Sequence, residues 1–182
     1  MLRKLIIITL LLSCTAATYA QKKGKKKKKQ KEQTEAAVPE KIDYKSIGAL
    51  MPPLKVILKD SSVISGKDLE NASNIFVMMF NPTCEHCQEE TIVLEKNIHL
   101  FDKTKVILIA SPEMHSYLDF YNNVTRYTKY PSLLVGVDSA RFIQNTFLYE
   151  ALPQINIYNK KRKLVKIFNG DTPIDSLKLY ID

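Results

Sequence analysis

Apolar positions from residue 53 onward fall into short runs separated by polar turns, which is typical of a chain that alternates strands and helices. The runs that predict strands are 53–58, 63–64, 75–80, 105–110, 133–137, 154–158 and 164–168. Ile75 to Phe80 is uninterrupted by polar residues and predicts a central strand that is covered on both faces. The first two runs flank Lys59-Asp60-Ser61-Ser62, which predicts an N-terminal β-hairpin.

Helices are expected between these strands. One should run from near Thr83 to Asn97, and another should begin with Ser111 as N-cap, carry Pro112 in its first turn and end near residues 122–123. Two more are expected over 139–147 and 172–180. Together these elements predict an α/β domain over residues 42–182, in which a central mixed β-sheet is flanked by helices and extended by the N-terminal hairpin.

The first 20 residues predict a secretory signal peptide. Arg3 and Lys4 precede an apolar stretch, and small residues follow it up to Ala20. We therefore expect the protein to be exported, to the periplasm of a bacterium. A second processing route stays open, because Leu11-Leu12-Ser13-Cys14 loosely resembles a lipobox and would place a lipid anchor on Cys14.

Residues 21–41 predict a disordered, lysine-rich linker, because a segment with so few apolar residues cannot bury a core. Residues 1–41 hold eleven lysines or arginines and three glutamates, whereas residues 42–182 hold sixteen basic and sixteen acidic residues. This charge balance argues against a nucleic-acid-binding domain, which would carry a basic folded face. Lys22–Lys31 either form a solubilising tether or contact the anionic cell envelope.

Cys84 and Cys87 stand directly after the central strand, at the predicted start of a helix. A helix N-terminus stabilises a thiolate, which is the reactive form of cysteine, so Cys84 is the candidate nucleophile. Cys87 lies one helical turn later and is the candidate resolving thiol. A disulfide that closes so small a loop contributes little stability, so we expect the bond to form and break rather than to act as a staple.

With this pair in place, residues 50–182 resemble the thioredoxin fold and, within it, the exported TlpA/ResA-like thiol–disulfide oxidoreductases. Cys84-Glu85-His86-Cys87 matches the active-site motif of that family, and Leu152-Pro153 matches its cis-proline, which lies beside the cysteines and presents backbone to a docked substrate. Glu90 stands where ResA-like members carry a carboxylate near the active site. The alternative for Glu90 is a solvated carboxylate next to Glu89.

Two departures from the family pattern change the expected chemistry. The residues just ahead of the motif are Asn81-Pro82-Thr83 rather than an aromatic residue, and Met78 replaces the buried acid of thioredoxin. Glu90 is therefore the carboxylate that we expect to handle protons. His86 would stabilise the thiolate form of the pair and Glu85 would oppose it, which predicts an intermediate reduction potential.

The resemblance also implies partners. These are protein dithiol or disulfide substrates and a membrane or periplasmic redox partner, while no nucleotide or flavin motif points to a cofactor. The same residues leave other functions open. A copper site built from the two cysteines and a distant histidine, His99 or His115, would resemble Sco-like metallochaperones, although those place three residues between the cysteines. A non-catalytic binding module is a further alternative.

A peroxiredoxin is disfavoured by spacing. That family places its peroxidatic cysteine three residues after a threonine, and the residue three after Thr83 is His86. A structural zinc site is disfavoured as well, because it needs four cysteine or histidine ligands and no second pair accompanies Cys84 and Cys87.

Overall fold

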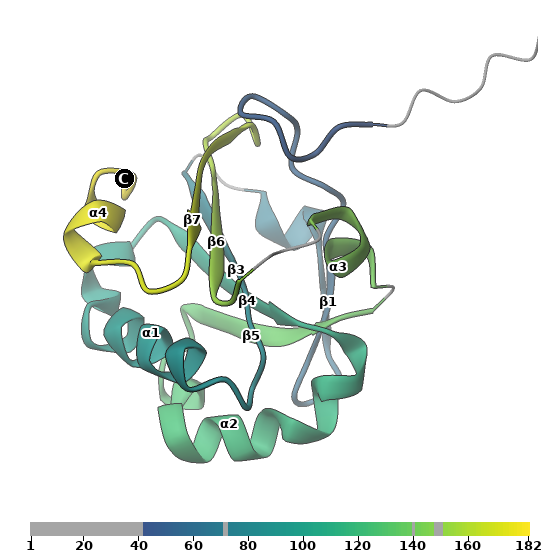
Figure 1. Ribbon diagram of the computed structural model, residues 1–182, viewed down its shortest axis with the longest axis vertical. Helices are drawn as coiled ribbons and strands as arrows, with labels where there is room; N and C mark the ends of the chain where they lie inside the picture. The colour runs from purple at the N-terminus through teal and green to yellow at the C-terminus, as the bar shows by residue number, and fades with distance from the viewer. Residues whose placement is uncertain (1–41, 71–72, 140, 148–150) are drawn as a thin grey trace, which may run out of the picture. The chain divides into compact units, whose positions relative to one another are not determined.

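The computed structural model describes residues 42–70, 73–139, 141–147 and 151–182. The predicted signal peptide, Cys14 and the lysine-rich linker lie outside these residues. Within the described residues, a single sheet of seven strands organises the fold, in the order β2-β1-β5-β4-β3-β6-β7 (Figure 1). The strands are β1 (Lys55–Leu58), β2 (Val63–Ser65), β3 (Ile75–Met79), β4 (Lys105–Ala110), β5 (Leu133–Asp138), β6 (Gln154–Tyr158) and β7 (Leu164–Asn169).

The sheet is mixed, as predicted. β3, β4 and β5 are parallel, whereas β1 pairs antiparallel with β5 and β6 pairs antiparallel with β3. β1 and β2 form the predicted hairpin at one edge, and β6 and β7 form a second hairpin at the other. Each strand lies within two residues of its predicted bounds. The buried strands β3 and β4 stand out because their apolar runs are continuous.

Helices cover both faces of this sheet. The α-helices are α1 (Glu85–Lys96), α2 (Leu118–Thr125), α3 (Phe142–Phe147) and α4 (Ile174–Lys178), and the 3-10 helices are η1 (Gly66–Leu69), η2 (Ile98–Phe101), η3 (Pro112–Tyr117) and η4 (Tyr127–Lys129). Figure 1 shows α1 and α4 on one side of the sheet and α3 on the other. Every residue of β3 is buried, which confirms that this strand is central.

The two faces of β3 belong to two cores. Phe76 and Met78 pack with side chains from α1, α2 and α4, whereas Ile75, Val77 and Met79 pack in the cluster that includes α3. Burying such side chains is the main favourable contribution to folding. Within the described residues, no helix combines the length and the apolar character that a membrane crossing requires.

Two predicted helices begin differently in the structure. The segment from Pro112 starts as 3-10 helix η3, and the Ser111 side chain makes no capping hydrogen bond. The following helix α2 extends to Thr125, where Arg126 turns the chain with a positive φ of 62°. Helix α3 starts at Phe142 rather than near residue 139, because Arg141 has a φ of 55° and the Asp138 carboxylate accepts the Ile143 N–H at 2.6 Å.

Two close backbone approaches occur in this sheet, one at its β7 edge and one between β1 and β5. Residues just after the predicted linker run beside β7: the Gly48 N–H donates to Leu164 O at 2.7 Å, and the Leu164 N–H donates to Ala49 O at 2.8 Å. On the other side, β1 passes so close to β5 that a Cβ at Gly136 would overlap the carbonyl oxygen of Ile57.

Candidate active site

A tight turn places Cys84 at the start of α1. The Asn81 side-chain oxygen accepts the Thr83 N–H at 2.9 Å, and the Cys84 N–H donates to the Asn81 carbonyl at 3.0 Å. Asn and Asp favour such turns because their short side chains bond the backbone two residues on. The sequence Asn81-Pro82-Thr83, which departs from the family pattern, thus builds the loop between β3 and the cysteine pair.

The two thiols differ in accessibility. Cys84 is the N-cap of α1 and is partly exposed, whereas Cys87 is fully buried. The Cys87 N–H points at Cys84 Sγ, 3.4 Å away. Burial raises the pKa of the Cys87 thiol, and the neighbouring Cys84 raises it further. Cys84 is therefore the thiol that a partner can reach, and Cys87 needs a proton acceptor before it can react.

The Leu152-Pro153 peptide bond is cis and lies opposite the cysteine pair. Cys84 Sγ is 4.0 Å from the Leu152 carbonyl oxygen, and the Gly170 N–H donates to the Pro153 carbonyl at 2.8 Å. Residues far apart in the sequence, at positions 84, 152 and 170, therefore meet at one place.

Glu90 lies on α1 one turn after Cys87 and is only 3% exposed, so it is not the solvated carboxylate of the alternative interpretation. Its Oε2 accepts the Thr172 N–H at 3.0 Å, and its Oε1 has no hydrogen-bond partner among the described residues. Burial raises the pKa of Glu90 to about 7, and the charge of Asp171 adds to the effect. A carboxyl group that exchanges its proton near neutrality thus lies on the same helix as the buried thiol.

His86 and Glu85 are exposed, and the imidazole faces carboxylates rather than a sulfur. His86 Nδ1 is 3.1 Å from Asp171 Oδ2 and 3.9 Å from Glu89 Oε2. In the described part of the chain, no hydrogen bond joins His86 to Cys84. The expected influence of His86 on the thiolate would therefore act through space, and in competition with Asp171.

Sequence reasoning missed four residues that surround the pair: Thr91, Tyr121, Asp171 and Thr172. The Cys87 carbonyl accepts hydrogen bonds from the Thr91 hydroxyl at 2.9 Å and from the Tyr121 hydroxyl at 3.2 Å. These two hydroxyls also contact each other. Thr91 is four residues after Cys87, which is the spacing of a helical neighbour, but nothing in the sequence places Tyr121 or the 171–172 loop beside the cysteines.

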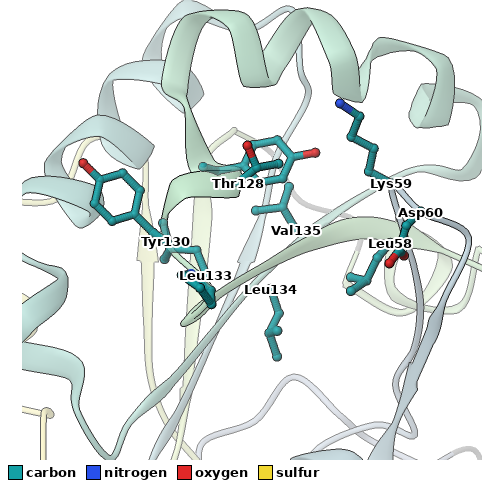
Figure 2. Close-up of a pocket in the computed structure, with 10 residues that line it drawn as sticks. Leu58, Lys59, Asp60, Thr128, Tyr130, Leu133, Leu134 and Val135 are labelled. Carbon is teal, nitrogen blue, oxygen red and sulfur yellow. The ribbon is translucent and has the colours of Figure 1, made fainter.

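A pocket of about 470 Å³ lies away from the cysteines, where β5 begins and β1 ends (Figure 2). Leu58, Leu133 and Val135 supply apolar walls, and the Lys59 side chain reaches toward α2, where it pairs with Asp119. Because β3 and β5 are parallel, the start of β5 lies at the edge of the sheet opposite to the cysteine pair. The pocket is therefore separate from the cysteine pair.

The described residues contain no group of three or more His, Cys, Asp or Glu side chains placed to hold a metal ion. His115 Nε2 lies 3.2 Å from the Leu58 carbonyl, and His99 is exposed on η2. Neither histidine joins the cysteines, so the geometry does not favour the copper alternative.

No family model and no curated protein sequence matches the chain. Solved structures do. The thioredoxin domain of a thiol-disulfide oxidoreductase from Bacteroides vulgatus is 14% identical, with a TM-score of 0.61 over 75% of this chain and 99% of that one. StoA from Bacillus subtilis is 14% identical, with a TM-score of 0.55 over 70% of this chain and 95% of that one.

A third similar structure is the exposed lipoprotein thioredoxin of Streptococcus pneumoniae, which is 21% identical, with a TM-score of 0.52 over 69% of this chain and 94% of that one. The chain has the thioredoxin fold. The predicted fold class is thereby confirmed. TM-scores of 0.52 to 0.61 over most of the chain establish the architecture, whereas identities of 14–21% do not establish an activity.

Proposed function

We propose that this protein is an exported thiol–disulfide oxidoreductase of the TlpA/ResA-like type, which exchanges disulfides with protein substrates in the cell envelope and with a membrane or periplasmic redox partner. The observation that carries the proposal is the pairing of an accessible Cys84 with a buried Cys87 at the start of α1, opposite the carbonyl of Leu152. Two of the similar structures, the thioredoxin domain of a thiol-disulfide oxidoreductase and the exposed lipoprotein thioredoxin, support the same chemistry.

In the reductive direction, the Cys84 thiolate attacks one sulfur of a substrate disulfide. A mixed disulfide forms, and the other substrate sulfur leaves as a thiolate that takes up a proton. The Cys87 thiolate then attacks Cys84 Sγ, which releases the second substrate thiol and leaves the Cys84–Cys87 disulfide. The substrate gains two electrons and the pair loses two, and the reverse sequence oxidises a substrate dithiol.

Glu90 is proposed to accept the Cys87 proton in the second step. The burial that raises the pKa of Cys87 makes this thiol a poor nucleophile until the proton leaves. Glu90 is buried one turn further along α1, and its pKa of about 7 suits a group that must both take and return a proton near neutral pH.

The test is the reduction potential of the pair, measured by equilibrating the purified protein with glutathione or dithiothreitol buffers, with Cys84→Ala as control. A potential near about −270 mV indicates a reductase, and one near about −120 mV indicates a dithiol oxidase. A pair that does not cycle between dithiol and disulfide would overturn the proposal and favour a non-catalytic binding module.

A further inference from the structure

An acidic groove adjoins the cysteine pair. It has a volume of about 530 Å³, and its lining includes the acidic side chains Glu89, Glu90, Asp171 and Asp175 but no lysine, arginine or histidine. The groove lies between the middle of α1 and the segment that runs from the loop after β7 into the start of α4. Neighbouring carboxylates repel one another, and a cation placed among them relieves that repulsion.

Asp171 connects this groove to the reactive sulfurs. Its carboxylate lies 3.1 Å from His86, which is one of the two residues between the cysteines. In the chain it stands between Gly170, whose N–H donates to the Pro153 carbonyl at 2.8 Å, and Thr172, whose N–H donates to Glu90 Oε2 at 3.0 Å, so this loop joins the groove to the cis-proline opposite Cys84. A molecule in the groove would therefore lie beside a substrate bound at Cys84.

The negative charge of the groove is only partly compensated within the described chain. Asp175 pairs with Lys178 at 2.9 Å, while Asp171 and Glu89 share the single imidazole of His86. The side chains of Glu89 and Asp171 are 62% and 61% exposed, so a ligand can reach both. Glu90 differs, because it is buried and its Oε1 has no partner among the described residues. Buried polar atoms are normally paired, so this oxygen is open to a hydrogen-bond partner that an occupant of the groove would supply.

The remaining walls of the groove favour an occupant with an aliphatic part. Val93, Pro173 and Ile174 contribute apolar surface next to the carboxylates. Lysine and arginine side chains combine a methylene stem that packs on apolar surface with a cationic head that seeks carboxylates. Arginine in particular donates several hydrogen bonds in a fixed fork, which suits a site with more than one carboxylate.

We propose that this groove binds a lysine or arginine side chain of the substrate protein, close in the substrate sequence to the cysteine whose disulfide Cys84 attacks. The inference rests on the proposed function and specifies its substrate class: proteins in which a basic residue neighbours the exchanging cysteine. Asp171 and Glu89 would contact the cationic head, and Val93 would contact its stem.

The test uses synthetic peptides with one cysteine in a mixed disulfide with thionitrobenzoate. Arginine, or its neutral isostere citrulline, is placed at successive distances of about one to five residues from the cysteine. The dithiol form of the full chain reduces each peptide, and thionitrobenzoate release gives the rate. We expect arginine to accelerate the reaction about fivefold or more at the best distance. The acceleration should diminish at high salt.

Asp171→Asn should bring the ratio of the arginine rate to the citrulline rate close to one. The matched control is Asp102→Asn, which removes the same charge from an exposed residue after η2 and should keep the ratio. Because the ratio is taken within each variant, a smaller folded fraction cancels. Equal rates for the arginine and citrulline peptides at every distance, or an equal loss of the ratio in both variants, would overturn the groove proposal but leave the proposed function standing. If the original protein reduces no peptide faster than the Cys84→Ala variant does, both the groove proposal and the proposed function fail.

Discussion

Replacing Glu90 by glutamine should change how the stability of the protein depends on pH. The pKa of this carboxyl is about 7 in the folded chain against an ordinary value of 4.5. The folded chain therefore holds the proton more tightly than the unfolded chain does. The contribution of Glu90 to the free energy of unfolding is therefore fully present below about pH 4.5 and is lost as the pH rises through about 7, where the buried carboxyl ionises.

The size of the effect follows from the two pKa values. At about 1.36 kcal/mol per pH unit, the part of the fall that lies between about pH 5 and pH 8 amounts to about 2–3 kcal/mol. Glutamine keeps an oxygen that can accept the Thr172 N–H but cannot ionise. The difference in stability between Glu90→Gln and the original protein should therefore shift by about 2–3 kcal/mol in favour of the variant across this range.

Urea unfolding followed by circular dichroism, with both cysteines kept reduced by a phosphine, measures this difference at the two pH values. Glu89→Gln is the matched control, because it removes the adjacent carboxylate, whose side chain is 62% exposed. A constant difference between Glu90→Gln and the original protein at both pH values would refute the reasoning. An equal shift for Glu89→Gln would show that the effect does not come from burial.

Three further predictions concern residues around the pair and the sheet. Cys87→Ser should leave the mixed disulfide on Cys84 unresolved, so that mass spectrometry detects a trapped substrate adduct that the original protein releases. Gly136→Ala should lower the free energy of unfolding by about 3 kcal/mol or more, because its Cβ would overlap the Ile57 carbonyl; Gly66→Ala, with nothing within 4 Å of the added Cβ, should change it by less than about 1 kcal/mol in the same denaturation assay. Thr91→Val removes the hydrogen bond to the Cys87 carbonyl and should cost about 1–2 kcal/mol by denaturation, whereas an unchanged midpoint would argue against that bond.

The strands could be predicted from the sequence because their signal is local. Ile75–Met79 and Lys105–Ala110 are buried on both faces, so their apolar runs are continuous and their bounds stand out. Helix boundaries were harder. Arg126 and Arg141 adopt left-handed backbone conformations that end or delay a helix, and arginine carries no sequence signal for a positive φ.

The candidate site likewise contains local features that the sequence predicts and long-range contacts that it does not. The spacing of Cys84 and Cys87 is local, so it could be read directly, and Glu90 was named through a family resemblance. Whether Glu90 is buried depends on the loop that follows β7, which folds back on α1 from more than 80 positions away. Asp171 and Thr172 belong to that loop, and only the tertiary structure gives them a place beside the cysteines.

The strand-like contact of residues 48–51 with the start of β7 covers part of an edge of the sheet. The open side of an edge strand is a template on which another chain can add a strand, and proteins cover or charge such edges to avoid it. Here Gly48 and Ala49 form hydrogen bonds with the backbone C=O and N–H of Leu164. Further along the strand, the charged Lys166 side chain lies over the ring of Phe168. A fragment that begins after Met51 would keep the cysteine pair but expose the backbone at the start of β7. We expect such a fragment to self-associate through that edge.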